Sequence, residues 1–593
     1  MAEGGCSNAE INYDEPLLLS TSSNNGIGFI EGVVNYRGEK VSRYDRLKYG
    51  GWKSASYIIV AEMGETVANY GIAANLINYL TGPLGQSTVS AATNVNVWIG
   101  VMWILPLFGA FIADSYLGRF RTVFFSSLIY VLGLGLITIS VVLPAHECPN
   151  DDTGNNASCS SASSFKVIFF FTSLYLVAVG KAGFKPCAEA FGADQFDGRN
   201  PEECEYKSSF FNWWYFGLCI SSSFSLLILT YVQDNLNWGI GFGIPCISMA
   251  FALITFLLGR KSYRYSLKED NQNPLLGIAQ VFITAAKNWR STSSSVTTQL
   301  EEDIVIPLHD RVGADQFKFL DKALIDTASI SGESRVNDKP CSIRQVEDAK
   351  VVLRLIPIWS TCLIYAVVIA QAPTFFTKQG STMNRLVGSN VHIPPASLQA
   401  LISLSIIFFM PIYDRVFVPF ARNFTGEPNG ITMLQRLGCG MFLSTLAMVV
   451  SAIVEKKRLQ AAADFGLIDM PKETVPMSVW WLIPQYLLLG LTEVLTMVGL
   501  QEFFYDQVPD GLRSMGVSIY LSIFGVGNFL SGFLISIIEK VTSGSSQHSW
   551  FPDNLNRAHL DYFYWFLAGL SAVDMVAYIY FSNSYLYKRK AST

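Results

Sequence analysis

The chain has 593 residues, of which half are hydrophobic and only 15% are charged, whereas soluble domains carry about 25% charged residues. Its mean hydropathy is +0.31, and its formal net charge is −5 at pH 7. This composition excludes an ordinary soluble domain, and the small acidic balance argues against nucleic acid as a partner. The sequence therefore predicts an all-α membrane protein that crosses the lipid bilayer many times.

Twelve apolar segments are long enough to cross a bilayer, which requires about twenty residues per helix. Six precede and six follow a long polar stretch, which predicts two six-helix bundles, 51–258 and 346–585, joined by a linker over 259–345. Residues 1–50 and 586–593 are then the two tails. The predicted spans are 55–80, 93–113, 122–144, 165–190, 209–231, 237–258, 350–376, 394–419, 432–454, 477–504, 515–539 and 561–583.

The distribution of Lys and Arg predicts which side of the membrane each loop faces. Six of these residues precede the first span and twelve lie within 259–345, whereas the connections over 81–92 and 145–164 have none. Positively charged loops remain on the cytosolic side. Both termini and the linker are therefore predicted to be cytosolic, with the basic run 456–458 as an exception on the opposite side.

The first fifty residues contain no cleavable signal peptide and predict a disordered tail. Within it, Asp14, Leu18 and Leu19 fit the acidic dileucine pattern D-x-x-x-L-L, a sorting signal that an adaptor protein would read. If this signal is used, it favours the vacuolar membrane. Otherwise the plasma membrane is expected.

The loop over 145–164 is predicted to face away from the cytosol. It contains Asn156 in an Asn-Ala-Ser sequon, which predicts glycosylation. Cys148 and Cys159 lie in the same loop, where the sequence is as consistent with a disulfide as with an accidental pair.

The first span carries a polar stripe within an otherwise apolar segment. A carboxylate at the centre of a membrane helix costs roughly 2.5–3.5 kcal/mol, so it normally faces protein or a water-filled cavity. The polar residues recur at i, i+3, i+4, i+7 and i+8 and therefore share one helical face, which is predicted to line a central cavity. They are Glu62, Glu65, Thr66, Asn69 and Tyr70.

Two lysines, Lys181 and Lys185, stand four residues apart in the fourth span and project from one face. An unpaired ammonium in hydrocarbon is as costly as a carboxylate, so these lysines are expected to meet Glu62 and Glu65. Such a cluster can exchange a proton for a salt bridge, because burial disfavours a charged carboxyl and a nearby cation favours it. The alternative for Lys185, which precedes Pro186, is that it reaches the cytosolic interface.

The seventh and tenth spans supply further polar residues. Glu493 lies in a strongly apolar stretch, so it is expected to face protein or water, and a purely structural, hydrogen-bonded carboxylate is the alternative. Thr496, three residues later, extends the same polar face. The seventh span contributes Gln371 and Thr374.

The connection after the second span combines an acid, a glycine and two arginines, which can latch neighbouring helices by charge. These residues are Asp114, Gly118, Arg119 and Arg121. A milder copy follows the eighth span at the corresponding place of the second half, which predicts an internal repeat. It consists of Asp414 and Arg415. The pair of loops resembles the loop signature of the major facilitator superfamily.

Further motifs occur in order along most of the chain. They are Tyr79-Leu-Thr-Gly-Pro-Leu, Lys185-Pro-Cys, Phe191-Gly-Ala-Asp-Gln-Phe-Asp, Phe210-Phe-Asn-Trp-Trp-Tyr-Phe, Phe317-Lys-Phe-Leu-Asp-Lys-Ala, Phe376-Thr-Lys-Gln-Gly and Gln501-Glu-Phe-Phe-Tyr-Asp-Gln-Val-Pro-Asp-Gly-Leu-Arg-Ser. Together they resemble the plant nitrate/peptide transporter family, a branch of the proton-dependent oligopeptide transporters. The resemblance implies the major facilitator fold and secondary transport by alternating access.

In the resembled family the first span carries E-x-x-E-[R/K], which is linked to proton coupling. Glu62 and Glu65 match this motif, but Thr66 replaces the cation. We hypothesise that Lys181 supplies the missing charge. The alternatives are an uncoupled facilitator or exporter on the same fold and a sensor that binds substrate without transport.

The intramembrane positions of these polar residues, taken with the resemblance, give their expected roles. The expected proton-coupling residues are Glu62, Glu65, Lys181, Lys185 and Glu493. The expected substrate-binding residues are Thr66, Asn69, Tyr70, Gln371, Thr374, Glu493 and Thr496. The sequence has no phosphate-cradling Gly-Lys-Ser/Thr loop and no metal-ligand spacing, so we expect no enzyme, ATP-driven pump, cofactor or metal.

The substrate class stays open. Peptide-transporting relatives use basic residues on the first-span stripe, where Thr66 and Ala73 stand here, and some nitrate-transporting relatives carry a histidine where Ile369 stands. Both differences weigh against simple peptides and against histidine-based nitrate binding. Nitrate held by Lys181 or Lys185 remains open, as does a small organic solute such as a hormone, a specialised metabolite or a peptide.

Overall fold

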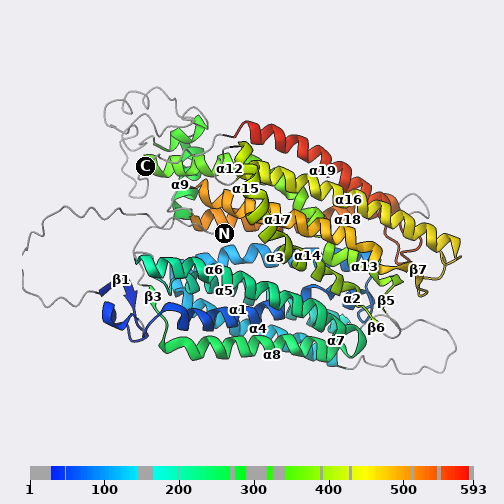
Figure 1. Ribbon diagram of the computed structural model, residues 1–593, viewed down its shortest axis with the longest axis horizontal. Coiled ribbons are helices and arrows are strands. Elements are labelled where there is room, and N and C mark those ends of the chain that lie inside the picture. The colour runs from blue at the N-terminus through cyan, green and yellow to red at the C-terminus, as the bar shows by residue number, and fades with distance from the viewer. Residues whose placement is uncertain are drawn as a thin grey trace, which may run out of the picture.

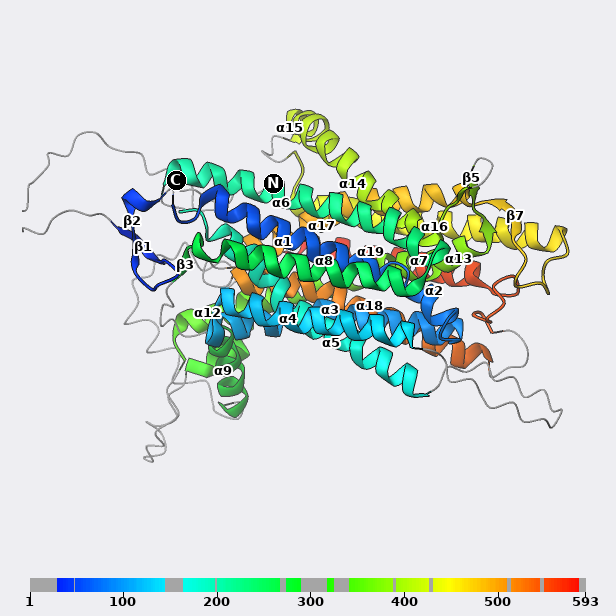
Figure 2. The same cartoon turned by 90° about the horizontal axis from the view of Figure 1, so that it is seen from below.

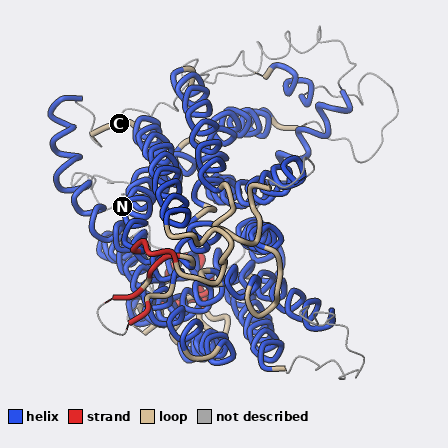
Figure 3. Tube along the Cα trace, turned by 90° about the vertical axis from the view of Figure 1, so that its right-hand side faces the viewer, coloured by secondary structure: helices blue, strands red, loops and turns tan. Residues whose placement is uncertain are grey.

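Long helices form two bundles that lie side by side (Figures 1 and 2). The computed structural model describes residues 29–46, 48–143, 164–197, 200–266, 274–288, 317–324, 341–387, 391–425, 430–508, 513–543 and 549–585. Helices make up most of this chain, and the strands are short (Figure 3). One end of the molecule carries β1 and α9, at the left of Figure 1, and is called the α9 end below. The opposite end carries β7 and is called the β7 end.

The N-terminal bundle is built from six long helices and two short ones. Its helices are α1 (Gly51–Ala73), α2 (Leu76–Thr81), α3 (Thr88–Ile112), α4 (Arg119–Val142), α5 (Ser164–Ala193), α6 (Pro201–Phe224), α7 (Thr230–Asn235) and α8 (Trp238–Leu258). Short turns of helix adjoin them: η1 (Arg43–Asp45), η2 (Ala113–Leu117), η3 (Ser225–Leu229) and η4 (Gly259–Lys261).

The linker and the C-terminal bundle follow the same plan. Their helices are α9 (Pro274–Lys287), α12 (Ile343–Ile369), α13 (Thr377–Ser381), α14 (Ala400–Ile412), α15 (Val418–Thr425), α16 (Met433–Asp464), α17 (Ile483–Asp506), α18 (Arg513–Ser543) and α19 (Leu560–Asn583). The short turns are η8 (Lys318–Leu324), η9 (Ala372–Phe376), η10 (Pro395–Gln399), η11 (Tyr413–Phe417) and η12 (Val479–Leu482).

Three small sheets stand at the two ends of the molecule. The first has strand order β2-β1-β3, a second pairs β4 with β7 in parallel, and a third pairs β5 with β6 in antiparallel orientation. The strands are β1 (Phe29–Val34), β2 (Lys40–Ser42), β3 (Tyr265–Ser266), β4 (Met383–Asn384), β5 (Leu386–Val387), β6 (Val391–His392) and β7 (Val475–Ser478).

The helical membrane architecture predicted from the sequence is confirmed. Among the described residues, eleven helices are long and apolar enough to cross a membrane, and they coincide with the second to twelfth predicted spans. The first predicted span corresponds to α1 and α2. Helix α1 is not among the eleven. It packs along α6 and α8 inside the N-terminal bundle, and its carboxylates face protein rather than lipid.

The two bundles meet where α3 crosses α18. Gly100 and Gly525 face each other at this crossing: a Cβ atom on Gly100 would lie 3.0 Å from the carbonyl oxygen of Gly525, and the reverse distance would be 3.2 Å. Small residues allow such close approach of membrane helices, whose association depends on packing rather than on the hydrophobic effect. The α3–α18 crossing is therefore the seam between the bundles.

The two predicted repeat loops have the same local structure. A π-helical turn, η2, follows α3 in the second span, and another, η11, follows α14 in the eighth. Gly118 ends η2 with a φ of +80°, a conformation that favours glycine. Arg119 then forms an ion pair of 2.5 Å with Asp194, the residue after α5, so this loop is joined to α5 by charge.

The N-terminal segment differs from the disordered tail predicted from the sequence. Residues 29–50 include β1, β2 and η1, and β1 also pairs with β3, where the linker begins. The prediction was wrong because the polarity of this segment gives no sign of its partners. Those partners lie in loops more than a hundred residues away.

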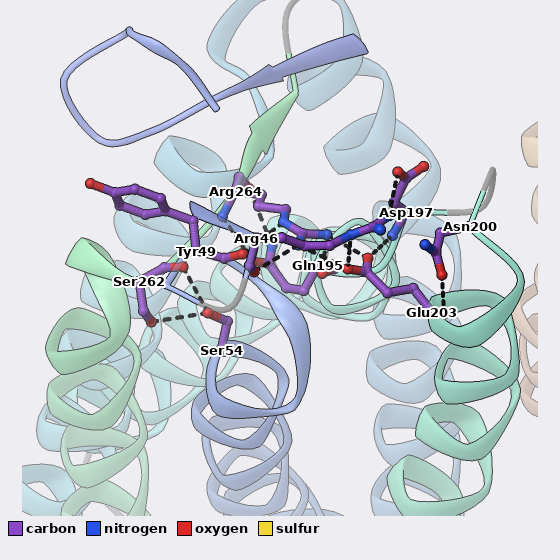
Figure 4. Close-up of polar contacts among 9 residues, drawn as sticks. All are labelled: Arg46, Tyr49, Ser54, Gln195, Asp197, Asn200, Glu203, Ser262 and Arg264. Carbon is purple, nitrogen blue, oxygen red and sulfur yellow. Dashed lines mark hydrogen bonds and ion pairs between the residues drawn. The ribbon is translucent and has the colours of Figure 1, made fainter. Parts of the chain in front are cut away.

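Arg264 organises the α9 end of the N-terminal bundle (Figure 4). Only 1% of it is exposed, and its guanidinium donates to both carboxylate oxygens of Glu203, at 2.7 and 3.1 Å. It also donates to the carbonyl oxygens of Tyr49, Gln195 and Arg46. Because these residues come from three separate segments, a single buried side chain fixes the N-terminal segment to α6 and to the loop before it.

The linker packs on the C-terminal bundle. Helix α9 buries Ile278, Val281 and Ala285 in one apolar cluster with η8 and α12. Lys350 of α12 is almost fully buried and forms an ion pair of 2.8 Å with Asp321 of η8. The described parts of the linker are therefore a cap on α12.

Replacing Arg264 with Met should lower the free energy of unfolding by roughly 3 kcal/mol at neutral pH, the lower end for a broken buried pair, because Glu203 loses its fully buried partner and keeps only the more exposed Arg46. Burial alone would raise the pKa of the Glu203 carboxyl, but hydrogen bonds from Arg264 and from the backbone N–H of Asp197 outweigh it and lower that pKa. A lowered carboxyl pKa contributes stability above the ordinary value of 4.5, and this contribution is lost as pH falls through the lowered pKa. The difference in thermal stability between wild type and variant should therefore shrink in acid.

Thermal unfolding of the detergent-solubilised protein between pH 7 and pH 3 would measure this difference. Arg557→Ala is the control, because Arg557 and its partner Asp469 are 61% and 69% exposed and such pairs contribute little. A difference for Arg264→Met that does not change with pH would contradict the role given to Glu203.

Candidate functional site

Helix α1 turns its polar stripe inward because its other face is built for close packing. A Cβ atom on Gly64 would lie 2.8 Å from the Cβ of Ala252 in α8, and one on Gly71 would lie 2.7 Å from the side chain of Leu229. These glycines seat α1 against α8 and η3. The stripe from Glu62 onward is thereby directed at α5.

Glu62 forms an ion pair with Lys185, as the sequence predicted. Glu62 is 1% exposed, whereas about a third of the Lys185 side chain is accessible. Oε1 of Glu62 accepts the hydrogen bond from Lys185, and the buried Oε2 has no hydrogen-bond partner among the described residues. The carboxylate is therefore paired on one oxygen and open on the other.

Lys181 has a different partner from the one predicted. Its ammonium donates to Oδ1 of Asn69 at 2.9 Å and lies 5.8 Å from the ring centre of Trp103 in α3. Among the described residues it forms no ion pair with Glu62 or Glu65. The prediction was wrong because one turn of α5 separates the two lysines, so Lys185 reaches Glu62 while Lys181 lies beside Asn69.

Glu65 is also buried, with 1% exposed, and accepts a hydrogen bond of 3.3 Å from the hydroxyl of Tyr130 in α4. The sequence analysis missed Tyr130, because tyrosines are frequent in membrane helices and nothing in its own span marks it. Thr66 is buried, and its hydroxyl has no partner among the described residues. Tyr70, in contrast, is 37% exposed.

Glycines in α5 bring the lysines close to α1. A Cβ atom on Gly180 would lie 2.6 Å from the backbone of Tyr130, and one on Gly183 would lie 2.1 Å from the hydroxyl of Ser126. On another side, a Cβ on Gly109 of α3 would lie 2.0 Å from the carbonyl oxygen of Ala182. Helix α5 is thus held between α3 and α4, which fixes the positions of Lys181 and Lys185 along the bundle axis relative to α1.

The opposite bundle contributes Glu493 from α17. It is partly exposed and has no hydrogen-bond partner among the described residues. Its carboxylate lies within electrostatic range of Tyr70 in α1 and Tyr215 in α6 of the N-terminal bundle, and of Tyr365 and Tyr520 of its own bundle. Its role in proton coupling or substrate binding stays a prediction.

Three other predicted residues of the C-terminal bundle point elsewhere. The hydroxyl of Thr374 donates to the carbonyl oxygen of Ala370 in its own helix. Thr496 packs so closely against Gly440 of α16 that a Cβ atom added to Gly440 would clash with Oγ1 of Thr496. Gln371 is fully buried in the seam and donates to Ser531 of α18 at 3.1 Å. The sequence showed that these residues are polar and intramembrane but not which neighbour each one faces.

Glu189 is a further acidic residue that the sequence analysis missed. It follows Lys185 by four residues in α5, so the spacing of Lys181 and Lys185 could have revealed it. Its carboxyl lies within electrostatic range of Lys185 and has no hydrogen-bond partner among the described residues. The central cluster, defined as Glu62, Glu65, Lys181, Lys185, Glu189 and Glu493, therefore contains four carboxyls and two ammonium groups.

The remaining predicted residues fall outside this cluster. Arg121 and Arg415 are exposed at their loops, and nothing is described for the side chains of Asp114 and Asp414. Asn156, Asp14, Leu18 and Leu19 lie outside the described residues. Within the described ranges, no three His, Cys, Asp or Glu side chains are grouped so that they could hold a metal ion.

Comparison with known proteins gives a consistent result. Residues 120–551 match the PTR2 profile, which describes the POT family. Protein NRT1/PTR FAMILY 5.10 of Arabidopsis thaliana is 55% identical over 95% of this chain and 98% of its own length.

Solved structures agree on the fold. The crystal structure of an auto-inhibited POT family peptide transporter superposes with a TM-score of 0.66 at 20% identity, and covers 91% of this chain and 99% of that one. A POT family transporter in complex with 5-aminolevulinic acid gives a TM-score of 0.61 at 17% identity, over 91% and 99% of the two chains. The predicted fold of two six-helix bundles is thereby confirmed.

Replacing Gly180 with Ala should destabilise the site, because the new methyl group would push α5 away from the backbone of Tyr130. Overpacking of this kind costs about 1–3 kcal/mol. Thermal unfolding in detergent measures this loss. Gly569→Ala in α19 is the matched control, since nothing lies within 4 Å of its added Cβ, and it should not lower stability. Equal effects of the two substitutions would contradict the close α4–α5 packing.

Proposed function

The chain belongs to the POT family of membrane transporters, and we propose that it couples proton movement to the transport of a small organic solute by alternating access. The observation that carries this proposal is the central cluster. The carboxyls of Glu62, Glu65 and Glu189 lie within electrostatic range of the Lys185 ammonium, Lys181 lies beside Glu62 and Glu65, and Glu493 stands in the opposite bundle, unpaired among the described residues. Burying two unbalanced negative charges is strongly unfavourable. The cluster therefore requires protons or a substrate to balance it.

Glu62 is the proposed proton site. Its Oε1 is paired with Lys185, and its Oε2 has no partner among the described residues. A proton on this carboxyl would release Lys185, and loss of the proton would restore the ion pair. Exchange between the two states changes a contact between α1 and α5, which gives a physical route from protonation to helix movement.

Lys181 is proposed to supply the positive charge that Thr66 lacks. It belongs to α5 and donates to Asn69 of the α1 stripe, which places its ammonium within electrostatic range of the Glu65 carboxyl rather than in direct contact with it. A cation at this distance lowers the energy of an ionised Glu65 while leaving the carboxyl accessible to Tyr130.

The proposed solute carries at least one hydrogen-bond donor, such as an amine or a hydroxyl group. Glu493 is an acceptor without a partner among the described residues, and it faces the stripe of α1. One solved family member is described in complex with 5-aminolevulinic acid, which has both an amine and a carboxylate. A solute of this kind could bridge Glu493 and the lysines of α5.

Nitrate is the second candidate. The ammonium of Lys181 has three donors and bonds to one neutral acceptor, Asn69, so an anion could approach it without breaking an ion pair. The excess of carboxyls opposes this reading unless protons accompany the anion.

The proposed orientation places the α9 end in the cytosol, as the distribution of Lys and Arg predicts. The first described strand, β1, and the linker helix α9 lie at that end. The proposed location is the vacuolar or the plasma membrane, with the dileucine pattern at Leu18 and Leu19 deciding between them through an adaptor protein.

Substrate-evoked current should increase between pH 7.5 and pH 5.5, because a proton enters with each solute. Voltage-clamped oocytes presented with nitrate, amino acids, dipeptides and plant hormones would test this, with Leu18 and Leu19 replaced by Ala if surface delivery fails. Glu62→Gln should abolish the pH dependence. Tracer uptake without current or pH dependence would mean that the chain is a facilitator, and binding without uptake would mean that it is a sensor.

Lys181→Gln should reduce coupled transport by about tenfold or more, because an uncompensated Glu65 carboxylate is left in the membrane. The same recordings compare it with Arg557→Ala, which removes an exposed pair at the β7 end. Wild-type pH dependence in Lys181→Gln would show that Lys181 does not replace the cation missing at position 66.

A further inference from the structure

Hydrogen bonds that join the two bundles gather toward the β7 end. Thr93 and Asn96 of α3 bond to Ser536 and Ser531 of α18, at 3.3 and 3.1 Å. Gln399 donates to the carbonyl oxygen of Ala74 at 3.0 Å. The partners in the N-terminal bundle lie at the end of α1 and in the first three turns of α3.

Two further contacts close around the turn between α2 and α3. The ammonium of Lys378 in α13 donates to Oγ1 of Thr81 at 2.9 Å. A carboxylate oxygen of Asp553, in the loop between α18 and α19, accepts from the backbone N–H of Thr88 at 2.8 Å. Thr88 is the first residue of α3, so Asp553 satisfies one of the unpaired N–H groups at that helix terminus from the other bundle.

These residues explain two motifs that the central cluster does not use. Thr81 belongs to Tyr79-Leu-Thr-Gly-Pro-Leu, and Lys378 belongs to Phe376-Thr-Lys-Gln-Gly. The two motifs come from different bundles and meet at one place. Lys378 is largely buried there, and the carboxylate of Asp553 lies within its electrostatic range.

A buried arginine positions the two segments that carry Lys378 and Asp553. Arg458 of α16 is fully buried and paired with Glu455 of its own helix at 2.7 Å. Its guanidinium donates to the carbonyl oxygen of Leu555, two residues after Asp553, and to Oγ1 of Thr382, which ends α13. The basic residue that departed from the positive-inside pattern is therefore part of the structure at the β7 end.

We propose that Thr81, Thr88, Lys378 and Asp553 form an outer clasp that holds the transport pathway shut at the β7 end, with Arg458 as its positioning residue. The inference rests on the proposed function, since it assumes that the two bundles alternate. In the structure described here the clasp is closed. Opening toward the β7 end must break both of its charged hydrogen bonds, so the clasp sets how often that end opens.

A disulfide reporter tests the clasp without any substrate. Thr93 and Ser536 are short side chains from opposite bundles with their hydroxyl oxygens 3.3 Å apart, so Thr93→Cys with Ser536→Cys should form a disulfide when the β7 end is closed. Thr445 and Ser571, 2.9 Å apart, lie within the C-terminal bundle and provide a matched control pair. Mass spectrometry of full-length protein in membranes gives the yield of each disulfide.

Lys378→Met and Asp553→Ala should each lower the initial rate of the Thr93–Ser536 disulfide by about threefold or more, because each removes a hydrogen bond to a charged group. Neither should change the rate of the Thr445–Ser571 disulfide, which reports that the bundle is folded. Arg557→Ala, in the same loop as Asp553, should leave both rates unchanged. Unchanged Thr93–Ser536 rates in both clasp variants, with the control pair intact, would overturn the proposal.

A second measurement separates failure of the clasp from failure of alternating access. Tyr70→Cys places a thiol at the exposed end of the otherwise largely buried α1 stripe, and a membrane-impermeant methanethiosulfonate reagent is added at the β7 side. The Thr93–Ser536 disulfide should slow the labelling of this thiol at least about threefold. Labelling of the same protein without Tyr70→Cys is subtracted as background. Equal labelling rates with and without the disulfide would contradict alternating access itself. Protection by the disulfide, combined with unchanged rates of disulfide formation in Lys378→Met and Asp553→Ala, would overturn the clasp alone.

Discussion

The cost of an unpaired charge inside a membrane protein governs this structure. Each buried charged side chain must find a counter-charge or hydrogen-bond partners, because water is not available to replace them. The chain meets this requirement at three levels along its length. Arg264 and Glu203 pair at the α9 end, Lys185 and Glu62 in the middle, and Arg458 and Glu455 at the β7 end. The positions of these pairs explain why polar residues interrupt otherwise apolar segments.

The three levels differ in how completely their polar atoms are satisfied. The guanidinium groups of Arg264 and Arg458 donate to carboxylates and carbonyl oxygens on several sides, and each fixes loops from separate parts of the chain. In the middle level, one oxygen of Glu62 and the hydroxyl of Thr66 have no partner among the described residues. Fully paired networks give rigidity, whereas unpaired buried groups mark a place that a proton or a ligand can fill. Proton and substrate binding are therefore expected at the middle level, whereas the outer two levels hold loops in fixed positions.

Sequence reasoning succeeded where a single helix carried the signal. The spacing of Glu62, Glu65 and Asn69 identified the inward face of α1, and the apolar surroundings of Glu493 identified an intramembrane carboxyl. It failed where the outcome depended on a neighbouring helix. The sequence could not tell that Thr496 faces Gly440 or that Lys181 lies beside Asn69, because these contacts depend on the rotation and height of packed helices. The N-terminal segment was mispredicted for the same reason, since Arg264 is distant in sequence.

Glycines set the geometry that side-chain chemistry then uses. Gly64 seats α1 on α8, Gly180 seats α5 on α4, and Gly100 with Gly525 forms the seam between the bundles. Close contacts inside a bundle make it rigid, so the proposed alternation would concentrate movement where the bundles meet. At the seam the backbones of Gly100 and Gly525 approach each other closely, which makes this crossing the pivot under that proposal. The charged hydrogen bonds of Lys378 and Asp553 lie away from this pivot, where a small rotation gives the largest displacement. Under the proposed alternation, contacts far from the pivot are therefore the first to break when the β7 end opens, so their energy acts directly on the balance between the closed and the open state.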